Sequence, residues 1–316
     1  MNAAPLLISY HKVESYLEAL PEPQQVRYAQ EISRLAEANL PPVVSPYCLA
    51  ILFGYSLEFI HALSKQQYKF YRTFTIKKGK KVREIQAPKV ALKVIQKWIG
   101  HHLCLTIKFP EHVFGFIPET SARMAAKQHC NAKWLYSIDI KDFFPSISEE
   151  LVSAAFQKIG YSEIGSQLAA SLCCFNGFLA QGSPASPVLS NLVMKDVDGE
   201  LKKLGEELGV TVTRYADDIV FSGKGVFPDN LKLLVGQIFK NTGLELNADK
   251  EYFADSLKGQ RLKVHGLLVN GDKPRLTKGY RNKIRAYKHL LEAGKVSNND
   301  LKRLNGHINY AESIDL

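Results

Sequence analysis

The sequence predicts an α+β protein whose sheet is antiparallel and whose first part is helical. Residues 24–40 carry apolar side chains at helical spacing on a charged background. Residues 68–76 and 133–140 alternate instead and are rich in aromatic and β-branched side chains, as strands are. The short apolar runs 211–215 and 219–221 lie so close together that they predict a hairpin. A chain of 316 residues is long enough for two domains or one large multi-lobed unit.

The boundaries of the elements follow from residues that start or stop them. Pro41 and Pro42 end the first long helix, and Gly79 is expected at a turn. Ser121 can cap a short helix, and Ser186 followed by Pro187 begins a long one. Helices are expected over residues 24–40, 47–63, 90–107, 121–130, 149–159, 162–174, 187–208, 230–241 and 280–291, with a hairpin over 68–85 and strands over 133–140, 211–215, 219–221 and 264–269. The last of these strands is interrupted by His265 and Gly266.

Composition favours an intracellular protein with a polyanionic partner. The chain is 46% hydrophobic and carries a net charge of +10, so nucleic acid is the simplest partner, although a basic protein without one is the alternative. Its five cysteines form no C-x-x-C pair, which indicates reduced thiols. We expect a cytoplasmic protein without a membrane partner, because no signal peptide pattern is present and the apolar run Tyr47 to Leu63 contains Glu58 and His61.

A basic run lies at the turn of the first hairpin. Five of the seven positions from Lys77 to Arg83 are Lys or Arg. The ordinary explanation is a solvated, positively charged loop tip. The functional explanation is a flexible clamp that closes on a triphosphate, with Arg83 as the most direct contact because guanidinium matches phosphate geometry.

Two adjacent carboxylates, Asp217 and Asp218, lie at the tip of the second hairpin. Neighbouring anions repel each other, so the pair is costly unless a cation lies between them. A hard divalent ion with oxygen ligands meets that need, and Mg²⁺ is the usual ion beside phosphates. The alternative is an Asp-rich turn, since Asp favours turns.

Asp139 ends the strand over 133–140, where a carboxylate is expensive to bury unless it is paired or metal-bound. We predict it as the third metal ligand, with the carbonyl of Ile140 able to add an oxygen; the alternative is a helix N-cap. Three carboxylates could hold two Mg²⁺ ions about 3.5–4 Å apart, which predicts in-line phosphoryl transfer.

The C-terminal part is strongly basic. From Lys273 to Lys288 there are seven Lys or Arg and no Asp or Glu. In a helix, one face would hold Tyr280, Ile284, Tyr287 and Leu291, with Lys278, Arg281, Arg285 and Lys288 beside it. This pattern predicts either a helix that packs on the core and faces a phosphate backbone, or a solvated helix face.

Together these motifs resemble the reverse transcriptase family. The likeness lies in five segments, in the family's order between about residues 65 and 290: Tyr71 to Pro88 (the basic fingers hairpin), Asp139 to Phe144 (the first catalytic block), Leu179 to Pro187 (L-P-Q-G-x-x-x-S-P, with Ala180 where Pro is usual), Tyr215-Ala216-Asp217-Asp218 (Y-x-D-D) and Gly243 to Lys250 (G-L-x-L-N-x-x-K). The resemblance implies an RNA-directed DNA polymerase, a nucleotidyltransferase that uses dNTPs and two Mg²⁺ ions.

The resemblance also implies a right-hand polymerase fold with an antiparallel palm sheet and an N-terminal helical extension. It divides the chain into a helical region over 1–65, fingers over 66–130, a palm over 131–255 with interleaved fingers segments, and the palm end with a basic thumb over 256–316.

The resemblance assigns roles to individual residues. Asp139, Asp217 and Asp218 would hold the metal. The nucleotide would be bound by Lys77, Lys78, Arg83, Phe144, Gln181, Gly182 and Lys250. Phe144 would be the steric gate against a ribose 2′-OH, or a plain core aromatic. Lys250 would be a general acid facing the polyphosphate, or a surface lysine.

Within the family, the chain resembles bacterial retron-type enzymes. The segment 115–129 resembles the retron pattern that ends in N-A-x-x-H, with Ala125 in place of Asn, and Val264-His265-Gly266 stands where retron enzymes carry V-T-G. The resemblance implies that these segments recognise the retron's own RNA through His129, Val264, His265 and Gly266. The alternative for His129 is a structural histidine.

A retron-type enzyme implies particular partners. These are a cognate non-coding RNA that serves as template and primer, a branched RNA–DNA product (msDNA) started from an RNA 2′-OH, and a separate effector or toxin in an antiviral defence system. The alternatives are another bacterial reverse transcriptase, of the diversity-generating or abortive-infection type, and a nucleoprotein scaffold that holds RNA and an effector.

Overall fold

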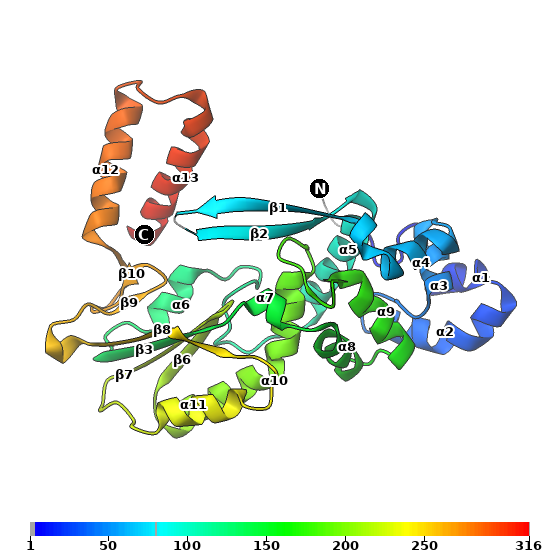
Figure 1. Ribbon diagram of the computed structural model, residues 1–316, viewed down its shortest axis with the longest axis horizontal. Helices are drawn as coiled ribbons and strands as arrows, with labels where there is room; N and C mark the ends of the chain where they lie inside the picture. Colours follow the sequence, from blue (N-terminus) through cyan, green and yellow to red (C-terminus); the bar gives the residue numbers. More distant parts are fainter. Residues whose placement is uncertain (1–3, 80, 316) are drawn as a thin grey trace.

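A four-stranded antiparallel sheet forms the centre of the molecule, with strands in the order β6-β7-β3-β8 (Figure 1). These strands are β3 (Trp134–Ile140), β6 (Thr211–Tyr215), β7 (Asp218–Gly223) and β8 (Leu246–Asp255). The computed structural model describes residues 4–79 and 81–315. The predicted α+β class and the antiparallel central sheet are confirmed.

The two faces of the sheet pack against different partners, as the alternation of side chains along a strand requires. Tyr136 and Phe221 belong to the main core, which includes α10 (Ser186–Glu207) and α11 (Leu231–Phe239). Leu135 and Val220, one residue away in each strand, belong to a second cluster that includes α6 (Ala122–Gln128). Both faces of the sheet are therefore covered near its centre.

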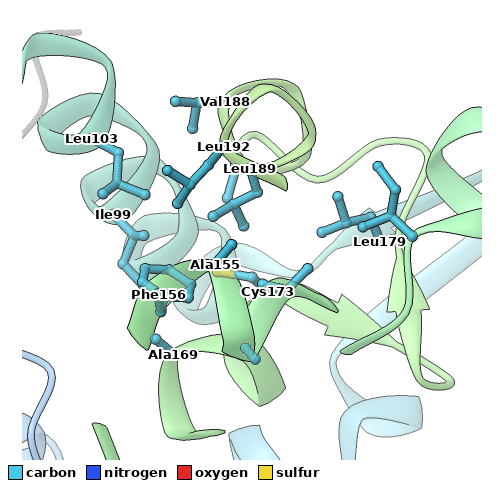
Figure 2. Packing of buried hydrophobic residues seen from close by; sticks show 14 of the residues in the cluster. Ile99, Leu103, Ala155, Phe156, Ala169, Cys173, Leu179, Val188, Leu189 and Leu192 are labelled. Carbon is cyan, nitrogen blue, oxygen red and sulfur yellow. The ribbon is translucent and has the colours of Figure 1, made fainter. Parts of the chain in front are cut away.

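The main core continues from the sheet into a group of packed helices. It contains α5 (Val90–Thr106), α8 (Glu149–Lys158) and α9 (Glu163–Cys173) beside α10. Figure 2 shows Ile99 of α5, Phe156 of α8 and Leu189 of α10 turned toward one another. The remaining short elements here are α7 (Phe143–Ser146), β4 (Cys174–Phe175) and β5 (Phe178–Leu179).

The N-terminal part is helical, as predicted, but the single helix expected over 47–63 is wrong. The chain forms α1 (Val13–Glu18), α2 (Glu22–Glu37), α3 (Pro46–Phe53) and α4 (Leu57–Lys65). Gly54 adopts a left-handed conformation that ends α3, and the Ser56 hydroxyl caps α4. In the described part of the chain no single helix is long and apolar enough to span a membrane; only α3 and α4 together meet that test, as a pair bent by 117°.

The predicted first hairpin is present and projects from the helical part (Figure 1). After a short 3₁₀ turn (Gln67–Lys69), β1 (Tyr71–Lys78) pairs with β2 (Lys81–Pro88) in continuous antiparallel register. The backbone N–H of Gln86 in β2 donates to the carbonyl of Gln181, 2.9 Å away, and so ties the base of the hairpin to the core.

The C-terminal part begins with a small sheet and ends in a helix pair (Figure 1). After a 3₁₀ turn (Ser256–Lys258) come β9 (Lys263–Val264), β10 (Leu267–Leu268), β11 (Arg275–Leu276), α12 (Lys278–Glu292) and α13 (Asn298–Asp315). The interruption predicted at His265 and Gly266 within the strand over 264–269 is confirmed. Both residues have positive φ and form a turn that folds β9 back onto β10, so the segment is two short strands. Buried Ile308 and Ile314 of α13 join the second cluster.

Candidate active site

The three predicted carboxylates come together at one end of the central sheet. β6 and β7 are joined by the two-residue turn Ala216–Asp217, and Tyr215 pairs with Asp218 across the hairpin. Asp218 in turn lies opposite Asp139 of β3 in register. The backbone N–H of Ile140 donates to the carbonyl of Asp217 at 2.9 Å, so the tip of the hairpin is fastened to the end of β3.

Negative charge is crowded at this tip. Burial, and then the nearby carboxylate of Asp139, raise the pKa of Asp217 above its usual range. Lys250 forms an ion pair with Asp139, and Nδ1 of His265 lies 3.2 Å from Oδ2 of Asp218. The protein thus places basic side chains against two of its three carboxylates.

The donor set suits a hard divalent cation. Within residues 4–79 and 81–315, no three His, Cys, Asp or Glu side chains converge closely enough to form a ready metal cluster. The three carboxylates nevertheless offer only oxygen atoms. Burial and the neighbouring Asp139 raise the pKa of Asp217, although the positive charge of Lys250 opposes that shift. Oxygen-rich, underneutralised sites are the ones that Mg²⁺ and Ca²⁺ prefer. The role of the Ile140 carbonyl as a ligand stays a prediction.

A buried ion pair supports the hairpin from below. Arg214, the residue before Tyr215, and Asp198 of α10 have side chains with no exposed surface. The pair is bidentate, with Nε to Oδ1 and Nη2 to Oδ2 both 2.6 Å. The third guanidinium nitrogen, Nη1, donates to the carbonyl of Ala216 at 3.0 Å, inside the turn. This ion pair therefore fixes the backbone that carries Asp217.

The same network reaches a second support, the loop over residues 112–116. Asn191 of α10 accepts from Arg214 Nη1 at 3.1 Å and donates to the carbonyl of Gly115 at 2.8 Å. A Cβ atom on Gly115 would lie 2.1 Å from the backbone nitrogen of Ala216. Only glycine therefore allows this loop to lie directly against the turn of the catalytic hairpin.

Sequence reasoning did not predict the supporting roles of Asp198, Asn191 and Arg214. The spacing of residues along α10 was nevertheless a signal for Asn191 and Asp198. Asn191, Met194, Asp198, Leu201 and Gly205 are spaced at three and four residues along α10, and all five are buried. Polar residues on such a face require partners inside the core. The pattern indicates that a buried partner exists, but not which distant residue it is.

His129 has the structural role that was its alternative, and the structure contradicts a contact with RNA. Its ring is fully buried, with Nδ1 2.7 Å from the Ser222 hydroxyl and Nε2 2.7 Å from the Thr213 hydroxyl. Burial, and then His265, lower the pKa of His129 to about 3, so the ring is neutral. His129 therefore braces β6 and β7 from inside the protein.

Phe144 packs beside Phe116 after the end of β3. It is half-buried in α7, just after β3, and its ring centroid is 5.8 Å from that of Phe116. Phe116 directly follows Gly115, which contacts the turn at Ala216. Phe144 thus contacts the residue that follows Gly115, and its role as a gate stays a prediction.

The other predicted nucleotide-binding residues gather around the first hairpin. Lys77 and Arg83 are exposed on β1 and β2, whereas the side chain of Lys78 and all of Lys80 lie outside the described residues. Gly182 has φ +139°, and a Cβ there would lie 2.9 Å from the carbonyl of Gln86. Gln181 and Gly182 therefore pack against β2. This close contact and the positive φ require glycine at position 182 even when no ligand is bound.

The predicted RNA-binding residues of the C-terminal part separate into two groups. Lys278, Arg281 and Arg285 are exposed on α12, while Lys288, also exposed, pairs with Glu312 of α13 at 2.8 Å. The side chain of Val264 is buried in the second cluster, which contradicts a side-chain contact with RNA.

His265 and Gly266 form the turn between β9 and β10. The ring of His265 contacts Tyr215 at 5.0 Å between centroids and is 9% exposed, so it supports the catalytic hairpin instead of presenting a surface to RNA.

Comparisons with known proteins agree with this geometry. Residues 76–275 match the family described as "Reverse transcriptase (RNA-dependent DNA polymerase)". The chain is 28% identical over 286 residues to the retron Ec86 reverse transcriptase of Escherichia coli, covering 89% of this chain and 88% of that protein. It is 31% identical over 262 residues to the retron Ec73 reverse transcriptase of Escherichia coli, covering 76% and 81%.

Among solved structures, telomerase from Candida albicans in complex with a fragment of telomeric RNA is similar, with a TM-score of 0.49 and 12% identity. The likeness covers 75% of this chain and 54% of that one.

We predict that Asp198→Asn lowers the free energy of unfolding by about 3–5 kcal/mol, because it leaves the buried Arg214 guanidinium without its counter-charge. Urea unfolding checks this value. The matched control is Asp196→Asn on the same helix, which removes an exposed pair with Lys158 and should cost less than about 1 kcal/mol. Equal, small losses in both variants would contradict a supporting role for the buried pair.

Proposed function

Because this chain belongs to the reverse transcriptase family, we propose that it copies a dedicated non-coding RNA into DNA with Mg²⁺ ions held by Asp139, Asp217 and Asp218. The chain is an RNA-directed DNA polymerase of the bacterial retron type with a right-hand polymerase fold. The observation that supports the metal assignment most directly is the register of Asp218 with Asp139 beneath the Ala216–Asp217 turn.

The chemistry is nucleotidyl transfer, in which positioning and charge neutralisation supply most of the catalysis. Two bound Mg²⁺ ions would activate the primer hydroxyl and stabilise the leaving pyrophosphate. Asp139 and Asp218 are held on neighbouring strands, and Arg214 fixes the turn that carries Asp217. Lys250 lies beside Asp139, where it can give a proton to the leaving pyrophosphate or screen the carboxylates.

The nucleotide is bound from the side of the first hairpin. Exposed Lys77 and Arg83, together with Lys78, would clamp the triphosphate. Gln181 and Gly182, which join this hairpin to the core through Gln86, would line the nucleotide pocket. In domain terms we assign residues 66–130 to fingers, 131–255 to palm with interleaved fingers segments, and 256–316 to the palm end and thumb, after the helical region over 1–65.

The likeness to retron enzymes supports a more specific proposal. The RNA would be both template and primer, DNA synthesis would begin at an RNA 2′-OH, and the product would be branched msDNA in the cytoplasm. A separate effector protein would complete an antiviral defence system. The similarity to the retron Ec86 enzyme, over 88% of that protein's length, favours this over diversity-generating or abortive-infection types.

Sequencing the nucleic acid that copurifies with the protein tests the retron proposal. We expect one structured RNA joined to a complementary DNA, with the junction sensitive to a debranching enzyme that cleaves 2′–5′ linkages. Protein expressed in cells that carry no retron RNA gene is the control. A heterogeneous RNA population, or DNA with an ordinary 5′ end, would contradict the proposal.

For the metal assignment, we predict that Asp217→Asn lowers dNTP incorporation by about a thousandfold or more, since loss of a metal ligand removes several kcal/mol of transition-state stabilisation. RNA affinity should stay near that of the natural protein. Primer extension with varied Mg²⁺ measures the effect. Asp249→Asn, an exposed acid of β8, is the matched control and should remain active. Full activity of the Asp217 variant would exclude the assignment.

For sugar selection, we predict that Phe144→Ala increases the ratio of ribonucleotide to deoxyribonucleotide incorporation, because the smaller side chain leaves room for a 2′-OH. Competition between rNTP and dNTP in primer extension measures that ratio. Phe143→Ala is the control, since Phe143 is buried in the core next to Phe144. Unchanged sugar selectivity with intact activity would remove Phe144 from the gate role.

A further inference from the structure

A buried glutamine of α5, Gln96, connects three segments that are distant in sequence. It is fully buried, and its amide nitrogen donates to the hydroxyl of Tyr71 at 2.7 Å and to the carbonyl of Leu172 at 2.8 Å. Its amide oxygen accepts from the hydroxyl of Ser183 at 2.7 Å. One side chain therefore contacts β1 of the first hairpin, the last turn of α9 and the loop that follows Gly182.

The partners of this amide fix its orientation. The carbonyl of Leu172 can only accept, so the amide nitrogen must face it and the amide oxygen is left to face Ser183. The Ser183 hydroxyl accepts from the backbone N–H of Ala185 at 3.2 Å and gives its own proton to Gln96. The carbonyl of Leu172 lies in the last turn of α9, where the helix itself supplies no donor. Both ends of the amide are thus engaged.

α5 holds the same loop at a second point, one turn further along the helix. Gly100 lies four residues after Gln96, on the same face of α5. A Cβ atom on Gly100 would lie 3.1 Å from the carbonyl oxygen of Pro184 and 3.3 Å from Cα of Ala185, closer than side chains usually approach. The hydrogen bond at Gln96 and the close approach at Gly100 together fix residues 183–185 on α5.

The start of the loop is fixed to the first hairpin. The carbonyl of Gln181 accepts from the backbone N–H of Gln86 in β2, and Gly182 lies against the carbonyl of the same residue. Because β2 pairs with β1 in continuous register, the contacts form a ring from β1 through Gln96 to the loop, and from the loop back to β2. The position of the loop relative to the base of the hairpin therefore depends on Gln96.

A small displacement at the base of the hairpin is enlarged toward its tip. At about 3.3 Å per residue, Lys77 is about 20 Å from Tyr71 along β1. A tilt of about 5° at the base would therefore move Lys77 by roughly 2 Å. Displacements of about 1 Å already weaken interactions that depend on exact placement. The basic side chains near the tip thus depend on how the base is held.

We propose that Gln96 is a positioning residue for nucleotide binding, because its amide sets the place of the Gln181–Gly182 loop relative to the first hairpin. The inference rests on the proposed function, which assigns the triphosphate to the hairpin and the nucleotide pocket to this loop. Gln96 is buried and acts on the nucleotide only through Tyr71 and Ser183. The position requires an amide, which offers an acceptor at one branch and two donor hydrogens at the other.

The first test measures nucleotide binding in three variants of the full chain, with poly(rA) annealed to oligo(dT) as template and primer. Gln96→Met keeps the length of the side chain and removes both hydrogen-bonding ends, whereas Tyr71→Phe and Ser183→Ala each remove one partner. We expect the KM for dTTP to rise about tenfold in Gln96→Met and about threefold in each of the others, with kcat within about twofold of the natural value.

Tyr16→Phe is the matched control. Tyr16 is also fully buried, and its hydroxyl donates to the carbonyl of Cys48 at 2.8 Å in the N-terminal helical part. Loss of this hydrogen bond should reduce stability without changing the KM for dTTP. General destabilisation lowers the active fraction, and with it the apparent kcat, so a change in KM separates positioning from stability.

The second test does not depend on catalysis. Hydrogen exchange is measured in the natural protein, in Gln96→Met and in Tyr16→Phe. We expect the backbone N–H of Gln86, which is bonded to the loop at Gln181, to exchange about tenfold faster in Gln96→Met, because the loop that protects it is no longer held. In Tyr16→Phe it should exchange at the natural rate.

The two tests together separate failure of the positioning role from failure of the proposed function. Unchanged KM and unchanged exchange at Gln86 would overturn the positioning role. Faster exchange with an unchanged KM would also overturn it, because the loop would then move without affecting the nucleotide. A lower kcat at unchanged KM, equal in Gln96→Met and Tyr16→Phe, would do the same. A natural protein that does not incorporate dTTP would refute the proposed function, and exchange at Gln86 would then decide by itself whether Gln96 holds the loop.

Discussion

The buried ion pair between Asp198 and Arg214 is the interaction on which the active-site geometry depends. It connects a core helix, α10, to the turn that carries Asp217, and it does so without exposed surface. Burying an ion pair costs desolvation energy, and the attraction between the two charges offsets only part of that cost. Here the ion pair positions the catalytic turn. The Arg214 guanidinium is held by Asp198 and Asn191, and it donates to the backbone carbonyl of Ala216.

Local pattern was sufficient to predict the parts of the site that follow one another in sequence. The hairpin around Asp217 could be predicted because two strand-forming runs are separated by a turn too short for any other connection. Asp139 could be placed beside it because a carboxylate at the end of an apolar strand needs a partner. Both arguments use neighbouring residues and the cost of burying charge.

Contacts between distant segments were not available to that reasoning. The resemblance implies RNA recognition by His129, and the sequence alone cannot choose between that role and a structural one. Its ring lies in a space that exists only once β6 and β7 are paired. His265 similarly faces Asp218 because a turn of two positive-φ residues reverses the chain. The helix expected over 47–63 divides at Gly54, since the left-handed residue ends one helix before Ser56 starts another.

The central sheet ends in an open edge. β8 is ten residues long, is the last strand in the order, and is exposed over most of its length in the described structure. Such an edge is a template for pairing with a strand of another molecule, and proteins prevent this by placing charges there. Asp249, Lys250 and Glu251 stand in the middle of β8. Besides its contact with Asp139, Lys250 is therefore one of the charges that disfavour pairing of β8 with a strand of another molecule.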